Sequence, residues 1–346
     1  IGKIAFLLVR DRSGIIQCVV DTREIEIKGL KLESVIEIKG KAVADESNVN
    51  GAEIQVHALD VISRAEELPI EINKESLNLN LDVLLNNRAL SLRNPKINAI
   101  FKIQAALVQG FSQYLVQHGF TQIFTPKIVA EGTEGGTNLF SVNYFDRKAY
   151  LAQSPQFYKQ MMVGASYERV FEVGHVYRAE SHDTKRHLNE YVSLDLEMAF
   201  IEDEYEIMEL ETQLLRYMLL HLTQVCKTEL ELSGAHMPVV PEEIPRLKLS
   251  EAIQILKIQY GKNNLDGDLD PEGEVLISGY VKEKYGSDFV FLTHYPQTKR
   301  PMYTMPAGDS ETHSFDLLFR GLEITTGGQR IHQYEKLKNN MLKHGL

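Results

Sequence analysis

The first part of the chain alternates short apolar runs with polar turns, a pattern that is typical of small β-domains. Four β-rich runs occur there, at residues 3–10, 15–20, 34–40 and 52–57. The first two flank the turn residues Asp11-Arg12-Ser13-Gly14 and therefore predict a hairpin. We expect a small β-barrel over residues 1–62, with its first strand missing because the chain enters directly on a strand.

After a linker around Pro69 the apolar period becomes helical. Over residues 96–118, apolar side chains recur at three- and four-residue steps, at Ile97, Ile100, Ile103, Leu107, Phe111 and Leu115. This spacing predicts one long amphipathic helix that buries the apolar stripe. A second long helix is predicted over residues 204–224.

Residues 191–200 alternate as a β-strand does. Five apolar side chains would point to one face, those of Val192, Leu194, Leu196, Met198 and Phe200. The opposite face would carry the carboxylates of Asp195 and Glu197. We expect the apolar face to be core, although a solvated strand edge explains the alternation equally well.

Composition narrows the class of protein. With 346 residues, 43% hydrophobic and 25% charged, the chain matches an ordinary globular protein of two domains. It has no apolar run long enough to span a bilayer and no signal-peptide layout, so we expect a cytoplasmic protein without membrane contact. The net charge of −11 argues against general nucleic-acid binding, so any nucleic-acid surface must be local.

Several kinds of chemistry are disfavoured by the motifs that the chain lacks. Cys18 and Cys226 stand far apart without CxxC spacing, which argues against a disulfide framework and a thiolate zinc site. Neither GxxxxGK(S/T) nor GxGxxG occurs, which argues against P-loop and Rossmann nucleotide binding.

Residues 170–180 and 191–200 are interpreted as antiparallel strands joined by the basic connection 181–190. Such a hairpin suits an anion, and Arg178 suits bidentate phosphate contact. The hairpin contains Tyr177-Arg178-Ala179-Glu180, Arg186-His187-Leu188-Asn189-Glu190 and Asp195-Leu196-Glu197-Met198-Ala199-Phe200. It resembles the second signature motif of class II aminoacyl-tRNA synthetases of the aspartyl, asparaginyl and lysyl subgroup.

That resemblance implies an ATP site on the hairpin. Arg178 would hold the ATP α-phosphate and Glu180 would face the adenine, so these two are the expected catalytic residues. Arg186, His187 and Leu188 in the connecting loop would cover ATP and the acceptor end of a tRNA.

A proline interrupts the strand-like run of residues 120–128 after the first long helix. An ordinary corner between a helix and an edge strand explains it, since proline suits strand ends. The run also resembles the family's first motif, a helix and strand that build a dimer interface around Pro126. The resemblance therefore implies a homodimer.

The segment Gln153-Ser154-Pro155-Gln156-Phe157-Tyr158-Lys159-Gln160 has two interpretations. It suits the start of a surface helix, with Ser154 as N-cap and Pro155 at the first helical position. It also resembles the amino-acid pocket of aspartyl-type enzymes, where asparaginyl enzymes typically carry a Ser-Gly-Gln-like sequence. The resemblance implies an L-aspartate site formed by Ser154, Gln156, Lys159 and Asp195. Lys159 would bind the aspartate β-carboxylate and pair with nearby acids such as Asp195 or Glu197.

Residues 314–332 mix acids, an arginine and a glycine pair. Taken alone, Asp316 and Glu323 are most simply solvated acids, although Mg²⁺ commonly takes one or two carboxylates together with substrate phosphates. The segment resembles the family's ATP–metal strand, which implies Asp316 and Glu323 as ligands of Mg²⁺-ATP and Arg330 as a partner of the aspartate side chain. Residues 131–137 resemble the family's flipping loop, with Glu134 near the substrate ammonium.

The resemblance covers nearly the whole chain and implies an α+β fold. An OB-fold over residues 1–62 would bind the anticodon, residues 63–83 would form a linker, and residues 84–346 would form an antiparallel catalytic sheet flanked by helices. Arg320-Gly321-Leu322-Glu323-Ile324 is most similar to the archaeal and eukaryotic branch. The family's third motif, with an arginine on the ATP γ-phosphate, is expected beyond His332, so we expect a chain incompletely represented at both ends.

The implied activity is ATP- and Mg²⁺-dependent activation of aspartate, followed by transfer to tRNA-Asp. The sequence leaves open whether tRNA-Asn is charged as well. One alternative is an asparaginyl enzyme, which shares nearly all the motifs. Another is a non-catalytic or amide-forming paralogue, although an amide-forming enzyme needs no anticodon module.

Overall fold

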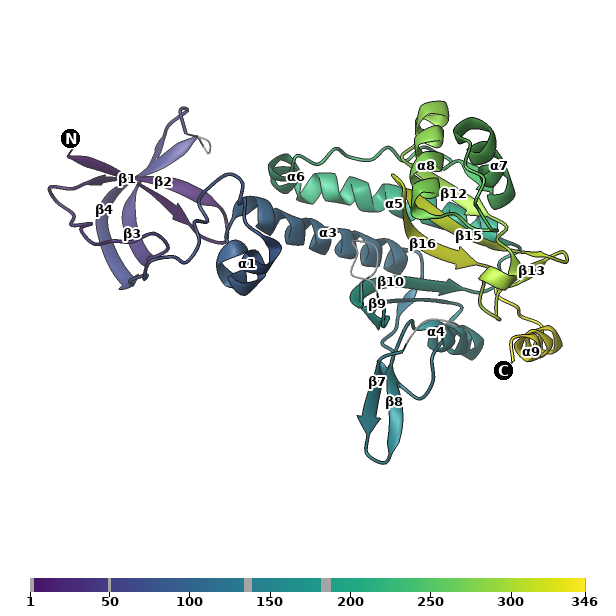
Figure 1. Cartoon of the computed structure of the whole chain (residues 1–346). Helices are drawn as coiled ribbons and strands as arrows, with labels where there is room; N and C mark the ends of the chain where they lie inside the picture. Colours follow the sequence, from purple (N-terminus) through teal and green to yellow (C-terminus); the bar gives the residue numbers. More distant parts are fainter. Residues whose placement is uncertain (1–2, 49–50, 134–138, 182–187, 346) are drawn as a thin grey trace. The chain divides into compact units, whose positions relative to one another are not determined.

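The computed structural model of the chain describes residues 3–48, 51–133, 139–181 and 188–345. It divides into two compact units, Ile1–Ile97 and Asn98–Leu346 (Figure 1). Each unit contains its own clusters of buried apolar side chains.

The first unit contains a four-stranded sheet of β1 (Ile4–Arg10), β2 (Ile15–Asp21), β3 (Val35–Ala44) and β4 (Ala52–Ser63). The order is β1-β2-β4-β3, with β2 and β4 parallel and the other neighbours antiparallel. Cys18, Val20 and Val56 are buried on it, because alternate residues of a strand face the same side. All four predicted β-rich runs are therefore strands.

Two short helices follow in the same unit, α1 (Leu81–Asn86) and α2 (Arg88–Ser91). Glu33 forms an ion pair with Arg10 at 2.6 Å and another with Arg93 at 2.7 Å. The Asn94 amide donates to the backbone oxygen of Ile72, which is itself buried. The segment predicted as a linker is thus partly packed against the unit.

In the second unit, helices α3 (Pro95–Gln117) and α5 (Glu204–Val225) pack against one sheet. That sheet has the order β10-β9-β5, formed by β10 (Glu190–Met198), β9 (Arg169–Tyr177) and β5 (Thr121–Gln122). Phe111 of α3 meets Phe171 of β9 edge to face, with ring centroids 5.8 Å apart. Both predicted long helices are confirmed.

The buried face of α3 differs in part from the predicted stripe, because Ile100 is 57% exposed. Small residues, Ala99, Ala106 and Gly110, are buried on the helix instead. A Cβ added at Gly110 would lie 3.3 Å from the Met218 backbone of α5. Close approach of α5 therefore decides which residues of α3 are buried.

The polar face of β10 is the more buried one, contrary to expectation. The side chains of Asp195 and Glu197 are 17% and 11% exposed, whereas Val192 and Leu194 are 40% and 38% exposed. Phe200, beyond the strand end, is 86% exposed. The helices α3 and α5 cover only the Leu196 and Met198 end of the apolar face, while α4 (Gln156–Met162) packs against β9 and β10.

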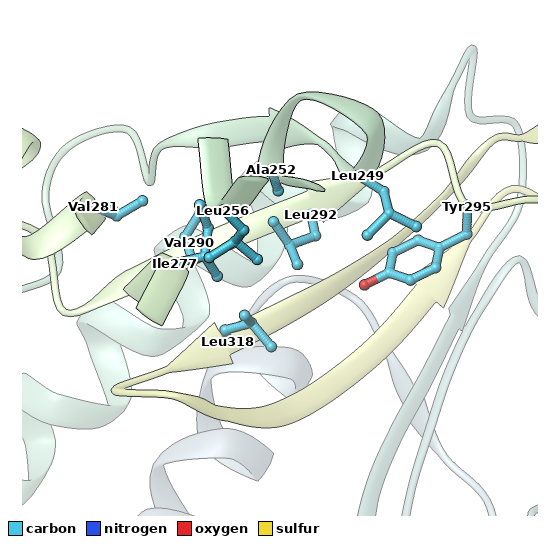
Figure 2. Close-up of a cluster of buried hydrophobic side chains, with 9 residues drawn as sticks. All are labelled: Leu249, Ala252, Leu256, Ile277, Val281, Val290, Leu292, Tyr295 and Leu318. Carbon is cyan, nitrogen blue, oxygen red and sulfur yellow. The ribbon is translucent and has the colours of Figure 1, made fainter. Parts of the chain in front are cut away.

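A second sheet of this unit has the order β11-β12-β15-β16, formed by β11 (Arg246–Lys248), β12 (Phe289–Thr293), β15 (Ser314–Phe319) and β16 (Leu322–Gly328). Helices α7 (Leu249–Tyr260) and α8 (Pro271–Tyr285) cover one face, where Figure 2 shows Leu256 and Ile277 beside Val290 of β12. Met208 of α5 packs with Phe315 on the other face. Both sheets are antiparallel except for the parallel pairs β5–β9 and β11–β12.

The remaining elements are short: β6 (Ile128–Val129), β7 (Ser141–Tyr144), β8 (Arg147–Leu151), η1 (Val163–Tyr167), α6 (Lys227–Ser233), η2 (Gln297–Lys299), β13 (Pro306–Ala307), β14 (Glu311–Thr312) and α9 (Tyr334–Lys343). The strand predicted over residues 120–128 forms only as β5 and β6. Pro126 lies between them and has no N–H to donate to a strand ladder. Within the described ranges, no helix is both long and apolar enough to cross a membrane.

A buried carboxyl group on α5 makes the stability of this unit depend on pH. Glu211 is 7% exposed, and its Oε2 has no hydrogen-bond partner in the described part of the chain. Burial raises the pKa of Glu211 to about 7, and a hydrogen bond with Thr325 opposes this only in part. The folded protein therefore keeps the Glu211 proton at pH values where the unfolded chain has lost it.

The contribution of Glu211 to stability is fully present below the ordinary pKa of 4.5 and is lost as pH rises through about 7. The loss should reach about 3 kcal/mol in the free energy of unfolding. Glu211→Gln should flatten this slope and raise the denaturation midpoint at pH 8. Glu209→Gln, at an exposed position of the same helix, should keep the wild-type slope. Equal slopes for Glu211→Gln and the wild type would contradict the assignment.

Candidate active site

Strands β9 and β10 form the predicted hairpin, paired from Arg169↔Met198 to Tyr177↔Glu190. Arg178 follows β9 directly, and its backbone N–H donates to the Asn189 carbonyl at 3.0 Å. Its guanidinium carbon lies 5.8 Å from the centre of the Tyr191 ring. The Arg178 Nε is buried without a hydrogen-bond partner among the described residues, so the hairpin presents a donor that an anion can fill.

Glu180 is held beside Arg178 by the end of the same connection. Its N–H lies 3.0 Å from the Asn189 side-chain oxygen and 2.8 Å from the Arg178 carbonyl. Leu188 is 54% exposed at the start of the returning segment. Three predicted site residues, Arg186, His187 and Glu134, lie outside the described residues.

A network of charged side chains connects α4 to the polar face of β10. Lys159 Nζ lies 2.9 Å from Asp195 Oδ1 and 3.6 Å from Glu197 Oε2. Gln156 donates to Glu197 at 3.1 Å and accepts from Arg330 Nη2 at 3.2 Å. Arg330 Nε lies 3.5 Å from Glu197 Oε1. The structure thus brings together Gln156, Lys159, Asp195 and Arg330, as the sequence predicts.

The charges of this network stabilise one another. Burial alone would lower the pKa of Lys159, but the carboxylates of Asp195 and Glu197 outweigh it and raise that pKa. Burial alone would raise the pKa of Asp195, but Lys159 and the Ser193 hydroxyl lower it. Lys159 and Arg330 therefore balance Asp195 and Glu197 before any ligand binds.

Ser154 lies at the edge of the network, just before α4. The helix begins at Gln156, with Pro155 in the cap position, so it starts one residue later than predicted. The Ser154 hydroxyl still accepts the Gln156 N–H at 3.3 Å, as the predicted capping side chain would, and it lies 3.1 Å from the Thr133 hydroxyl. Gln153 accepts the Thr133 N–H at 3.2 Å. These contacts attach the start of the Gly-rich 131–137 segment to the pocket.

The two acids predicted to bind metal lie on β15 and β16. Thr326 Oγ1 lies 2.9 Å from Asp316 Oδ1 and 2.8 Å from Glu323 Oε1, so both carboxylates meet at one hydroxyl. Asp316 and Thr326 are cross-strand partners, and a register shift after Leu317 brings Glu323 to the same side. Asp316 is only 5% exposed, which disagrees with the interpretation of both acids as solvated.

The donor set of this acidic site fits Mg²⁺ held together with phosphates. Glu323 is reached by solvent, yet burial of its carboxylate among neighbouring atoms and the Asp316 charge raise its pKa to about 7. The part of the chain that the structure describes contains no group of three or more His, Cys, Asp or Glu side chains suited to a metal ion. Two carboxylates match the usual Mg²⁺ arrangement, in which substrate phosphates and water complete the shell.

Two further contacts were not predicted from the sequence. Glu172, 3% exposed on β9, accepts from Thr125 N and Lys127 Nζ at 2.8 and 2.9 Å, and so fixes the segment around Pro126. Arg300 forms an ion pair with Asp316 at 2.8 Å. The strand alternation of residues 170–177 could have placed Glu172 opposite Asp195, but no sequence pattern pointed to Arg300.

Comparison with known families agrees with this arrangement. Residues 80–346 match the family of tRNA synthetases class II (D, K and N), and residues 1–63 match the OB-fold nucleic acid binding domain. This chain belongs to the class II tRNA synthetases. The predicted α+β fold, an OB-fold followed by the class II catalytic domain, is confirmed.

Similar proteins cover the full length of this synthetase. The aspartate–tRNA(Asp/Asn) ligase of Thermus thermophilus is 50% identical, over 100% of this chain and 81% of that protein. The aspartate–tRNA(Asp/Asn) ligase of Aeropyrum pernix is 46% identical, over 100% of this chain and 80% of that protein. Among solved structures, asparaginyl-tRNA synthetase from Pyrococcus horikoshii complexed with asparaginyl-adenylate has a TM-score of 0.91 at 33% identity, covering 100% of this chain and 81% of that one.

Proposed function

We propose that this synthetase activates aspartate with ATP and transfers the aspartyl group to tRNA-Asp. The observation that carries the proposal is the buried network in which Lys159 and Arg330 converge on Glu197, which Gln156 also contacts. Similarity over the full chain to relatives named aspartate–tRNA ligases supports the same substrate. Aminoacylation of purified tRNA-Asp and tRNA-Asn with each amino acid tests it.

Asparagine is the alternative substrate, because a solved asparaginyl-tRNA synthetase shares this fold. Charge is what separates the two amino acids. Aspartate brings a β-carboxylate that can share the cations Lys159 and Arg330 with the resident acids. Asparagine has the same shape without the charge and leaves at least one donor set poorly paired. We therefore favour aspartate.

The proposed chemistry needs no side-chain nucleophile. The aspartate α-carboxylate attacks the α-phosphorus of ATP, the bond from that phosphorus to the bridging oxygen breaks, and pyrophosphate leaves. Arg178 stabilises the charge that develops at the α-phosphate, and Glu180 orients the adenine. Mg²⁺, held by Asp316 and Glu323, would offset phosphate charge. In the second step a terminal ribose hydroxyl of the tRNA attacks the adenylate carbonyl and AMP leaves.

We assign the binding of tRNA to the first unit as well as the hairpin. Residues 1–63 match an OB-fold nucleic acid binding domain, which supports an anticodon-binding role. The chain carries a net charge of −11, so this contact must be local. We propose tRNA-Asp as the substrate and the cytoplasm as the site of action. Whether tRNA-Asn is charged is decided by the same aminoacylation assay.

The Mg²⁺ site leads to a prediction about metal dependence. Asp316→Asn and Glu323→Gln should each raise the Mg²⁺ concentration for half-maximal ATP–pyrophosphate exchange by at least about 10-fold, since even outer contacts of a metal site have effects of that size. Asp309→Asn, in an exposed turn, is the control. An unchanged Mg²⁺ requirement in both site variants would favour ordinary carboxylates without a metal role.

We further propose that the synthetase is a homodimer formed through the face around Pro126. Phe124 and Tyr167 are 82% and 48% exposed there. Both line a cavity of about 240 Å³ that also includes Pro126 and Tyr158. Large exposed apolar groups around a hollow are typical of an interaction site, and a second copy of the chain would cover them.

Phe124→Asp should therefore shift the protein toward monomer in sedimentation velocity, with at least about a 10-fold weaker dimer, because a charge would be buried without a partner. Ile258→Asp, on the 72% exposed Ile258 of α7, should leave the dimer intact. Equal dimer affinity in the two variants would show that the Pro126 face is not the interface.

A further inference from the structure

Arg300 is a buried cation beside the acidic site, and the proposed function has not used it. It follows η2 and its side chain is 10% exposed. Its guanidinium carbon lies 3.8 Å from the centre of the Tyr295 ring, and its Nη2 lies 2.8 Å from Asp316 Oδ1. A buried arginine held by both an aromatic ring and a carboxylate is costly to desolvate and is kept in one place.

The hydrogen-bonding capacity of Arg300 is not filled by the described residues. Its Nη2 is taken up by the approach to Asp316 at 2.8 Å, but its Nε is buried without a hydrogen-bond partner among them. Asp316 already accepts from the hydroxyls of Thr326 and Tyr295. A guanidinium with an unfilled donor suits an oxyanion, and phosphate is the oxyanion that fits it best in both geometry and charge.

The charge around Arg300 decides what can enter the site. The groups that interact electrostatically with it are Asp316, Tyr295 and Glu323. Asp268 interacts electrostatically with Glu323 and Tyr295, so it belongs to the same group of charges. A free divalent cation would have to approach Asp316 against a fixed positive charge 2.8 Å from the ligand oxygen. ATP phosphates would remove that repulsion, because their oxygens can pair with Arg300 and the metal together.

We propose that Arg300 is an internal counter-cation that excludes free Mg²⁺ from Asp316 and binds a phosphate oxygen of ATP, so that metal and nucleotide enter the site together. The inference rests on the proposed Mg²⁺-ATP role of Asp316 and Glu323. It adds a nucleotide-binding residue that lies outside the segments recognised in the sequence. If the proposal is right, Arg300 controls how tightly the nucleotide-free protein binds the metal.

The first experiment measures Mn²⁺ binding without nucleotide, by electron paramagnetic resonance of free Mn²⁺. Mn²⁺ accepts the same carboxylate ligands as Mg²⁺. Arg300→Gln should bind Mn²⁺ at least about 10-fold more tightly than the wild type, because a neighbouring positive charge is removed. Arg300→Lys keeps the charge and should bind as weakly as the wild type. Arg320→Gln is the control. Arg320 lies in the turn between β15 and β16 and pairs with Asp288, so this variant should leave the Mn²⁺ affinity unchanged.

Unchanged Mn²⁺ affinity in folded Arg300→Gln overturns the proposal. A second measurement decides the matter even where that variant does not fold. Asp316→Asn should leave nucleotide-free Mn²⁺ binding as it is in the wild type, since Asp316 is then closed to metal. If Asp316→Asn weakens nucleotide-free binding, Asp316 is open to metal and the proposal is wrong.

The failure of the underlying metal site would look different. The affinity for the non-cleavable analogue α,β-methylene-ATP at saturating Mg²⁺ should fall at least about 10-fold in both Asp316→Asn and Arg300→Gln. A loss in Asp316→Asn alone keeps the Mg²⁺ site and rejects the phosphate contact of Arg300. No loss in Asp316→Asn rejects the Mg²⁺ role proposed for Asp316 and with it the proposal.

Discussion

Arg178→Ala is expected to reduce aspartate-dependent ATP–pyrophosphate exchange by on the order of 10²-fold or more, which is the scale for removing one charge-stabilising donor. The guanidinium stands at the end of β9 over Tyr191, with its Nε unfilled by the described residues. We therefore expect it to bind a ligand rather than to pack in the apolar core. Its loss should lower the rate of adenylate formation while the fold remains.

The control for this prediction lies on the same strand. Arg169, at the other end of β9, donates to the His118 carbonyl and lies over the Phe120 ring. Arg169→Ala should keep near-normal exchange even if its thermal midpoint falls. Near-normal exchange in Arg178→Ala, with a folded protein, would remove the basis for the ATP site on this hairpin.

The second large effect is expected in the choice of amino acid. A buried charge left without its partner costs roughly 2–5 kcal/mol, so the wild type should prefer aspartate over asparagine by about 30-fold to several thousand-fold. Lys159→Met turns a balanced pocket into one with a net negative charge, because the two acids Asp195 and Glu197 lose the cation that pairs with both. The exchange rate with aspartate, whose side chain is anionic, should fall far more than the rate with asparagine, whose side chain is neutral.

The measurement is the ratio of exchange rates with the two amino acids before and after the change. Lys159→Met will also lose some stability, since it leaves buried acids unpaired. The ratio is therefore compared in folded protein, and Lys102→Met serves as the control. Lys102 forms an ion pair with Glu229, and its loss should leave the ratio unchanged. A constant ratio in Lys159→Met would mean that charge does not select the substrate.

How far the sequence predicted the fold depends on how local each pattern is. The spacing of apolar residues over 96–118 predicted α3, because the helical period is visible within a single segment. Which side of α3 is buried depends on α5, which approaches at Gly110 and leaves Ile100 exposed. In the same way, the alternation of apolar and acidic residues along β10 was predicted. However, α4 packs on the acidic face, and no pattern within residues 190–198 indicates this contact.

The candidate site shows the same division. Lys159 was expected to pair with Asp195 or Glu197, and the structure confirms contacts with both. Resemblance to a motif supplied that expectation, because α4 and β10 are joined only by the fold. Arg300 has no such motif. It reaches Asp316 across a loop, and an ion pair between distant segments leaves no periodic signal in the sequence.

The proposed function depends most directly on which amino acid the wild-type protein activates. ATP–pyrophosphate exchange measured with aspartate and with asparagine, at equal concentrations and saturating Mg²⁺, answers this without tRNA. We expect exchange that depends on aspartate, with exchange on asparagine slower by about 30-fold or more. Faster exchange with asparagine would contradict the proposed pocket and assign the synthetase to asparagine instead.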